Sequence, residues 1–247
     1  MPAACPSESI EVREVWNDNL EDEFQLIRCV LNEYLYVAMD TEFPGIVIRP
    51  LVKHKSDDKE FLFRSLKANV PASKLIQLGL TFSDADGNLP TFGTDKHFVW
   101  QSNFLEFDPA TDSFSKEFGI DEVHQITFRS ACDFGYLVKL LTGKNLPETR
   151  MVFLDLIKMY FPVVYDVKYM TRSCNWLHGG LNKNKIATLL GVERVGDSHQ
   201  AGSDSLVTSR AFMKLRESYY FRVSIDKYAG LLFGIGVEND QNHSILH

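Results

Sequence analysis

The chain has 247 residues, of which 45% are hydrophobic and 24% charged, and this composition disfavours disordered and fibrous classes in favour of a globular protein with a substantial core. The net charge of −7 disfavours a protein that holds nucleic acid on a broad basic surface, but it is compatible with an acidic site screened by bound metal ions. No apolar run reaches the length of a membrane span, and residues 1–6 lack the features of a signal peptide, so we expect an intracellular protein without a membrane partner.

Composition does not shift sharply anywhere along the chain, so residues 1–247 are expected to form a single domain. The four cysteines lie far apart without metal-knuckle spacing, which favours reduced thiols over a structural zinc site. Residues 239–247 are polar and predict a disordered tail.

The first predicted element is a helix over residues 20–31. Asn19 is expected to cap it, and the acids of its first turn interact favourably with the helix dipole. Its apolar residues recur at helical spacing and predict one buried stripe, made of Leu20, Phe24, Ile27 and Leu31.

The strand over residues 36–42 carries the main functional signal. Side chains alternate along a strand, so Asp40 and Glu42 point the same way, with Cα atoms about 7 Å apart. Two carboxylates held so close beside apolar residues are costly without a cation between them, and oxygen ligands favour Mg²⁺ or Mn²⁺. The alternative for an isolated pair is a strand that ends in two solvated acids.

The middle of the chain predicts further strands. The lysine- and arginine-rich residues 49–67 are expected to form a solvated loop, with a phosphate-contacting surface as the alternative. A nearly continuous apolar run predicts a central strand over 74–82, and a turn at 84–88 leads to a returning strand at 97–101. Residues 125–128 predict another short strand.

Asp133 stands at the head of the next predicted helix. Leu137, Leu140 and Leu141 follow it at helical spacing, so the carboxylate lies on the apolar side of the helix rather than opposite it. This pattern has two interpretations: Asp133 either caps the helix or belongs to a buried acidic site.

A helix is also predicted over 148–160, followed by a strand over 161–166. Its expected inward residues are Met151, Leu154, Ile157 and either Met159 or Tyr160. A short helix after Gly180 ends at Gly191.

The last predicted helix, over 201–215, also begins with an acid on its apolar face, as at Asp133. Asp204 lies one turn before Val207, on the face that packs inward. His199 precedes this helix, from where its ring could reach the carboxylates. A lone histidine here is more often a capping or surface residue, and it is the joint pattern that indicates a site.

These residues resemble the three motifs of the DEDD-type 3′→5′ exonucleases in the variant with histidine. More narrowly, several segments are similar to the CCR-associated factor 1 family of deadenylases over about residues 10–222. The segments are Met39-Asp-Thr-Glu-Phe-Pro-Gly45, Gln77-Leu-Gly-Leu-Thr81, Asp133-Phe-Gly-Tyr136, Tyr165-Asp-Val-Lys-Tyr169 and His199-Gln-Ala-Gly-Ser-Asp-Ser205. Residues 191–196 are similar to plant members.

The resemblance implies an α/β, RNase H-like fold with a mixed sheet flanked by helices. It implies poly(A)-specific removal of adenosines from the 3′ end of mRNA, releasing 5′-AMP, in the nucleus and cytoplasm. The implied partners are single-stranded poly(A) RNA, the scaffold subunit of the CCR-NOT complex and a second deadenylase.

The resemblance also implies two divalent metal ions, Mg²⁺ or Mn²⁺. Asp40, Glu42 and Asp204 are expected to hold one ion, and Asp40 is expected to bridge to a second ion shared with Asp133. His199 is expected to accept the proton of the attacking water, a role suited to a group that titrates near neutral pH.

The chain also departs from the family pattern. The stretch between Glu42 and Asp133 is shorter than in family members, and we expect reduced stability because a strand crossover needs a packed helix. Arg129 replaces a histidine, and residues 182–185 carry a doubled Asn-Lys dipeptide. The alternatives to an active deadenylase are therefore a catalytically weak, scaffold-binding adaptor and, more distantly, a DNA-directed exonuclease.

Overall fold

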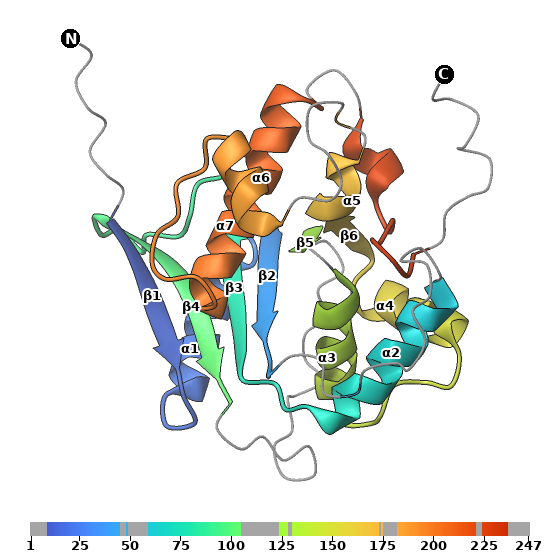
Figure 1. The fold of residues 1–247 in the computed structure, drawn as a ribbon. Helices are drawn as coiled ribbons and strands as arrows, with labels where there is room; N and C mark the ends of the chain where they lie inside the picture. The colour runs from blue at the N-terminus through green and yellow to red at the C-terminus, as the bar shows by residue number, and fades with distance from the viewer. Residues whose placement is uncertain are drawn as a thin grey trace.

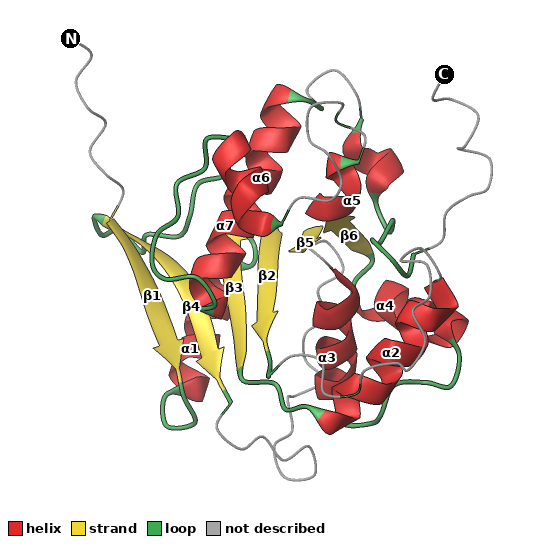
Figure 2. Ribbon diagram, in the orientation of Figure 1, coloured by secondary structure: helices red, strands yellow, loops and turns green. Residues whose placement is uncertain are grey.

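A computed structural model describes residues 9–44, 48, 59–104, 124–127, 130–172, 174, 182–220 and 224–236. It confirms the predicted mixed α/β architecture, in which helices cover both faces of a six-stranded sheet (Figure 1, Figure 2). The expected tail at 239–247, Arg129 and residues 105–123 of the shortened stretch lie outside these residues. Residues 49–58, the first part of the predicted loop, lie outside them as well. In the part of the chain that is described, no helix is long and apolar enough to cross a membrane.

The sheet has the strand order β1-β4-β3-β2-β5-β6. Strand β3 pairs antiparallel with both β2 and β4, whereas the pairs β1–β4, β2–β5 and β5–β6 are parallel. The strands are β1 (Ser9–Val15), β2 (Tyr36–Glu42), β3 (Gln77–Ser83), β4 (Lys96–Asn103), β5 (His124–Thr127) and β6 (Val163–Asp166).

Seven α-helices and one short 3-10 helix, η1 (Ile225–Tyr228), occur among the described residues, and the α-helices divide between the two faces of the sheet. They are α1 (Leu20–Val30), α2 (Lys59–Ala72), α3 (Ser130–Thr142), α4 (Arg150–Tyr160), α5 (Val167–Thr171), α6 (Lys183–Leu189) and α7 (Ala201–Ser218).

The central strand β2 contacts both helical layers because its side chains alternate. Ala38 packs in one hydrophobic cluster with the inner face of α7. On the opposite face, Val37 packs with α1, and Met39 packs with α2, α3 and α4. Asp40 and Glu42 therefore share the α7 side of the sheet with Ala38.

Helix α7 lies directly against β3. A Cβ atom added at Gly79 would stand 1.8 Å from the backbone oxygen of Ala201, so only glycine permits this approach. Two residues further along β3, the hydroxyl oxygens of Thr81 and Ser205 are 2.8 Å apart. These contacts fix the first turn of α7 over the sheet.

Four local predictions need correction. Leu20, expected in the buried stripe of α1, is exposed, whereas Phe24 and Ile27 are buried as expected. Asn19 occupies the N-cap position of α1, but its side chain accepts from the Trp16 N–H instead of capping the helix. Residues 59–67 belong to helix α2 and not to a loop, because Phe63 and Leu66 bury an apolar face in the core. In α4, Leu154 and Ile157 are buried as expected together with Phe153, whereas the other expected inward residues, Met151, Met159 and Tyr160, are exposed.

Glu23 forms a buried charged contact between α1 and the sheet. Its carboxylate accepts hydrogen bonds from Arg13 at 2.6 and 2.7 Å and from the Trp100 indole at 3.1 Å. We expect Glu23→Ala to lower the free energy of unfolding by about 3 kcal/mol, because both donors lose their acceptor. Urea denaturation measures the change. Glu21→Ala is the matched control, since its ion pair with Arg28 is exposed, and an equal loss in both variants would contradict the prediction.

Candidate metal centre

Three elements bring the predicted acids together at one end of β2. Asp40 and Glu42 are the last acids of β2, Asp133 lies in the first turn of α3, and Asp204 lies in the first turn of α7. Asp40, Asp133 and Asp204 are buried. The structure therefore unites the four carboxylates that the sequence singled out, together with His199 from the loop before α7.

Asp133 belongs to the site and is not a helix cap. Helix α3 begins three residues earlier, at Ser130. The Asp133 carboxylate instead accepts hydrogen bonds from the backbone N–H of Thr41, at 3.2 Å, and from its hydroxyl, at 2.7 Å. Because Thr41 stands between Asp40 and Glu42, these bonds hold the head of α3 against the acidic end of β2.

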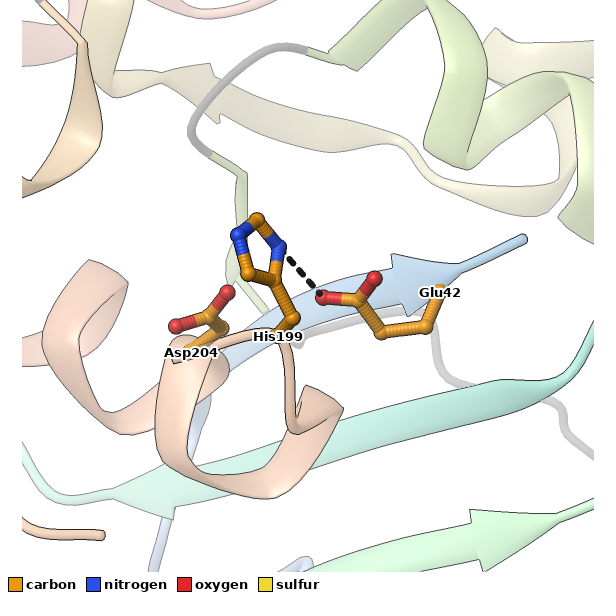
Figure 3. A group of neighbouring side chains, drawn as sticks. All are labelled: Glu42, His199 and Asp204. Carbon is orange, nitrogen blue, oxygen red and sulfur yellow. Dashed lines mark ion pairs between the residues drawn. The ribbon is translucent and has the colours of Figure 1, made fainter. Parts of the chain in front are cut away.

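Glu42, His199 and Asp204 form the open side of the centre (Figure 3). One potential ligand atom from each lies within 4.8 Å of the other two, and Nδ1 of His199 is 4.0 Å from Oε1 of Glu42. The His199 side chain is 87% exposed, and its φ of 64° is uncommon for a residue with a Cβ. The loop thus presents the imidazole at the solvent edge of a buried carboxylate cluster.

The electrostatics of the cluster favour a cation. Burial, followed by repulsion from Asp40, raises the pKa of Asp133 from 3.8 to about 8. Burial also raises the pKa of Asp40, against the attraction of Lys183, and burial together with repulsion from Asp40 and Asp204 raises the pKa of Glu42. Carboxylates resist ionisation in this way when too little positive charge surrounds them.

Two basic side chains, Lys183 and Arg194, also enter the centre. The Lys183 ammonium donates to Oδ1 of Asp40 and lies 3.6 Å from Oδ2 of Asp204. Burial lowers the pKa of Lys183, but attraction to Asp40 and Asp204 outweighs it and the pKa is raised. Sequence reasoning missed both cations, although the doubled Asn-Lys dipeptide marked the segment that holds Lys183.

Arg194 reaches the other oxygen of Asp204. Its Nη1 lies 2.5 Å from Oδ1 of Asp204, yet that oxygen has no partner in hydrogen-bond geometry. The distance describes an ion pair, and the poor angle leaves the lone pairs of a buried oxygen without a directed donor. Such an oxygen is suited to a ligand that approaches from the centre of the cluster.

The donor set fits divalent metal ions of the hard class. Four carboxylates converge from three elements, and hard oxygen donors match Mg²⁺ and Mn²⁺ better than zinc, which prefers nitrogen and sulfur. Oδ1 of Asp204, which is ion-paired but accepts no directed hydrogen bond, and the raised pKa values of three carboxylates support the same fit.

Phe43, which follows Glu42, and Lys168 of α5 both pack against aromatic rings. The Phe43 ring lies 4.7 Å from the ring of Tyr136 and packs against the main core, so Phe43 is a core residue. The Lys168 ammonium lies 5.2 Å from the centre of the Phe233 ring, while Asp166 accepts from the backbone N–H groups of Tyr169 and Phe233.

Comparison with known proteins agrees with the geometry. The model of the "CAF1 family ribonuclease" family matches residues 15–120 and 125–212. A probable CCR4-associated factor 1 homolog 7 from Arabidopsis thaliana is 52% identical, over 95% of this chain and 96% of the relative. The poly(A) ribonuclease pop2 of Schizosaccharomyces pombe is 37% identical, over 91% of this chain and 75% of the relative.

Solved structures give the same result. The structure of S. pombe Pop2p in its Mg²⁺- and Mn²⁺-bound form superposes with a TM-score of 0.76 at 36% identity, covering 90% of this chain and 99% of that chain. The structure of the yeast NOT1 MIF4G domain co-crystallised with CAF1 gives a TM-score of 0.75 at 27% identity, covering 93% and 99%.

The comparisons also bear on the shortened stretch. The alignment with the Arabidopsis relative runs over 269 positions, 22 more than the 247 residues of this chain, so at least that many positions have no counterpart here. The family match is interrupted at residues 121–124, which end at the first residue of β5. With the family model matching most of the chain and the relatives matching nearly all of it, this chain belongs to the CAF1 family of ribonucleases.

Proposed function

We propose that this chain is a poly(A)-specific 3′→5′ exoribonuclease that shortens mRNA tails by metal-dependent hydrolysis and releases 5′-AMP. The observation that carries the proposal is the convergence of Asp40, Glu42, Asp133 and Asp204 with His199 in a CAF1 family ribonuclease. Five side chains of the right chemistry, drawn from three elements and one loop, favour the enzyme over the adaptor.

Substrate and cofactor are supported by the relatives. The fission yeast relative is named a poly(A) ribonuclease, and the similar fission yeast structure carries Mg²⁺ and Mn²⁺. We assign one ion to Asp40, Glu42 and Asp204, and the second to Asp40 and Asp133. When bound, such a pair of ions lowers the pKa of a water and stabilises charge on the phosphate and on the leaving 3′-oxygen.

The protein's own residues orient the reaction. His199 is the proposed acceptor of the proton of the attacking water, and the position of its ring at the open edge of the carboxylates supports this role (Figure 3). The Glu42 oxygen lies 4.0 Å from Nδ1 of His199, on the same edge of the centre. Thr41 fixes the Asp133 carboxylate through two hydrogen bonds, and both of them end on Oδ1 and not on Oδ2.

The proposed partners follow the same reasoning. One similar structure contains CAF1 with the NOT1 MIF4G domain, which supports a NOT1-type scaffold as partner of this chain. A second deadenylase in the same assembly, binding of single-stranded poly(A), and a location in both nucleus and cytoplasm complete the proposal as expectations from the family.

Digestion of a 5′-labelled RNA that ends in an oligo(A) tail tests the function. With Mg²⁺ or Mn²⁺ we expect stepwise shortening that stops at the tail boundary and is lost in Asp40→Ala. An RNA with a 3′ tail free of adenosine is the matched substrate and should persist. Equal digestion of a DNA substrate would favour the DNA exonuclease, and no digestion by folded protein that still binds a NOT1 MIF4G domain would favour the adaptor.

His199→Asn is expected to lower kcat by roughly 10²–10⁴-fold, the usual contribution of a general base. Asparagine tolerates the positive φ at this position, and the side chain is exposed, so the melting temperature should stay within about 1 °C of wild type. A pH–rate profile provides the diagnostic readout, because the variant should lose the limb due to the base. An unchanged kcat with the same profile would remove His199 from the reaction.

A further inference from the structure

Lys183 occupies a position that the proposed reaction does not use. It is the first residue of α6, and its side chain is only 16% exposed. Its ammonium contacts Oδ1 of Asp40 and lies 3.6 Å from Oδ2 of Asp204. Its charge also attracts Asp133 and Glu42, so Lys183 contacts two of the four carboxylates and interacts electrostatically with all of them.

The start of α6 is held in place by neighbouring side chains. Asn182 caps the helix by accepting from the Lys185 N–H at 2.9 Å. Arg194 donates to Oδ1 of Asn184 at 2.7 Å and pairs with Asp204. Arg194 therefore links α6 to the same carboxylate that Lys183 approaches, and the lysine enters the centre from a fixed helix start.

The doubled Asn-Lys dipeptide supplies an internal comparison. Lys183 and Lys185 are two residues apart on one short helix, yet Lys183 points into the centre whereas Lys185 is exposed. They share local sequence and helix, so they differ mainly in this contact. Lys185 is the natural control for any change at Lys183.

We propose that Lys183 is a built-in counter-cation that neutralises the carboxylate cluster in the metal-free chain and must leave when a divalent ion binds. This inference rests on the metal site of the proposed function. The ammonium uses oxygens of Asp40 and Asp204, which are assigned there as metal ligands. A divalent ion held at about 2.0–2.6 Å from those oxygens would repel an ammonium group at the same carboxylates. Lys183 thus raises the metal concentration that the enzyme requires.

Titration of wild type, Lys183→Met and Lys185→Met with Mn²⁺, followed by calorimetry, tests the competition. Methionine keeps the length of the side chain without its charge. We expect roughly ten-fold tighter binding in Lys183→Met, since a charge-assisted contact no longer has to be broken, and wild-type affinity in Lys185→Met. Equal affinity in all three proteins would overturn the inference and leave the metal site intact. Absence of binding in all three would overturn the proposed site as well.

A second measurement uses the unmutated protein and does not depend on whether Lys183→Met folds. Amine acetylation followed by mass spectrometry is compared in EDTA and in saturating Mn²⁺. Displacement predicts that labelling of Lys183 rises several-fold in Mn²⁺ while exposed Lys185 is labelled equally in both. Labelling of Lys183 that stays the same or falls in Mn²⁺ would contradict displacement.

Discussion

Asp133→Asn is expected to stabilise the metal-free protein while it lowers hydrolysis by at least about a hundred-fold, because the amide cannot supply the charged ligand that the reaction needs. Asparagine keeps an oxygen that can accept from the Thr41 N–H and hydroxyl, as Asp133 does now. The substitution therefore removes a buried charge without removing its hydrogen bonds. Stability and activity should move in opposite directions.

The stabilisation should depend on pH in a defined direction. The pKa of Asp133 rises from 3.8 to about 8 on folding, so between these values the folded chain binds more protons than the unfolded chain. The free energy of unfolding must then fall as pH rises through this window. We expect Asp133→Asn to be more stable than wild type by several kcal/mol at pH 8, at about 1.4 kcal/mol for each unit of the pKa shift, and little different at pH 4. Denaturation in EDTA at both pH values measures this, and a variant less stable than wild type at pH 8 is the opposing result.

Gly79→Ala is expected to cost at least about 3 kcal/mol of stability and most of the activity. The new Cβ would stand 1.8 Å from the backbone oxygen of Ala201, and backbone on both sides cannot yield as a flexible side chain can. Relief requires α7 to move away from β3, which carries Asp204 and His199 away from β2.

Gly191→Ala is the matched control for this effect. Gly191 has a φ of 67° but no atom within 4 Å of an added Cβ, so alanine there should cost only about 1 kcal/mol of backbone strain. Urea denaturation and activity assays on both variants separate the effect of steric overlap with α7 from the effect of backbone strain. A Gly79→Ala protein as stable as wild type would show that α7 does not depend on this approach.

The sequence predicted the centre wherever a local rule was sufficient. The period of two along β2 put Asp40 and Glu42 on one side, and helical spacing put Asp204 at the head of α7 on its inward face. For Asp133 the local pattern did not decide between a helix cap and a buried acidic site. The choice depends on Thr41, 92 positions away, and contacts at that separation leave no local signal.

Other elements show where local sequence patterns do not determine burial or secondary structure. The α4 sequence is apolar on more than one face, so packing against the core, not periodicity, selects Phe153 over Met151 as a buried residue. Strand β1 was not predicted because its alternation is weak and charged residues interrupt it, and its register with β4 fixes it in place. Lys183 reaches Asp40 across 143 positions, which explains why the sequence indicated only the doubled dipeptide that contains it.

The most direct test of the central claim, that these carboxylates form one two-ion centre, is the number of Mn²⁺ ions bound per chain by equilibrium dialysis. We predict two ions for wild type, at most one for Asp40→Asn, and two for Asp155→Asn, whose acid is exposed on α4. Loss of binding in Asp40→Asn alone would establish Asp40 as the shared ligand. Two ions in Asp40→Asn, or none in wild type, would contradict the metal centre and the hydrolytic function that rests on it.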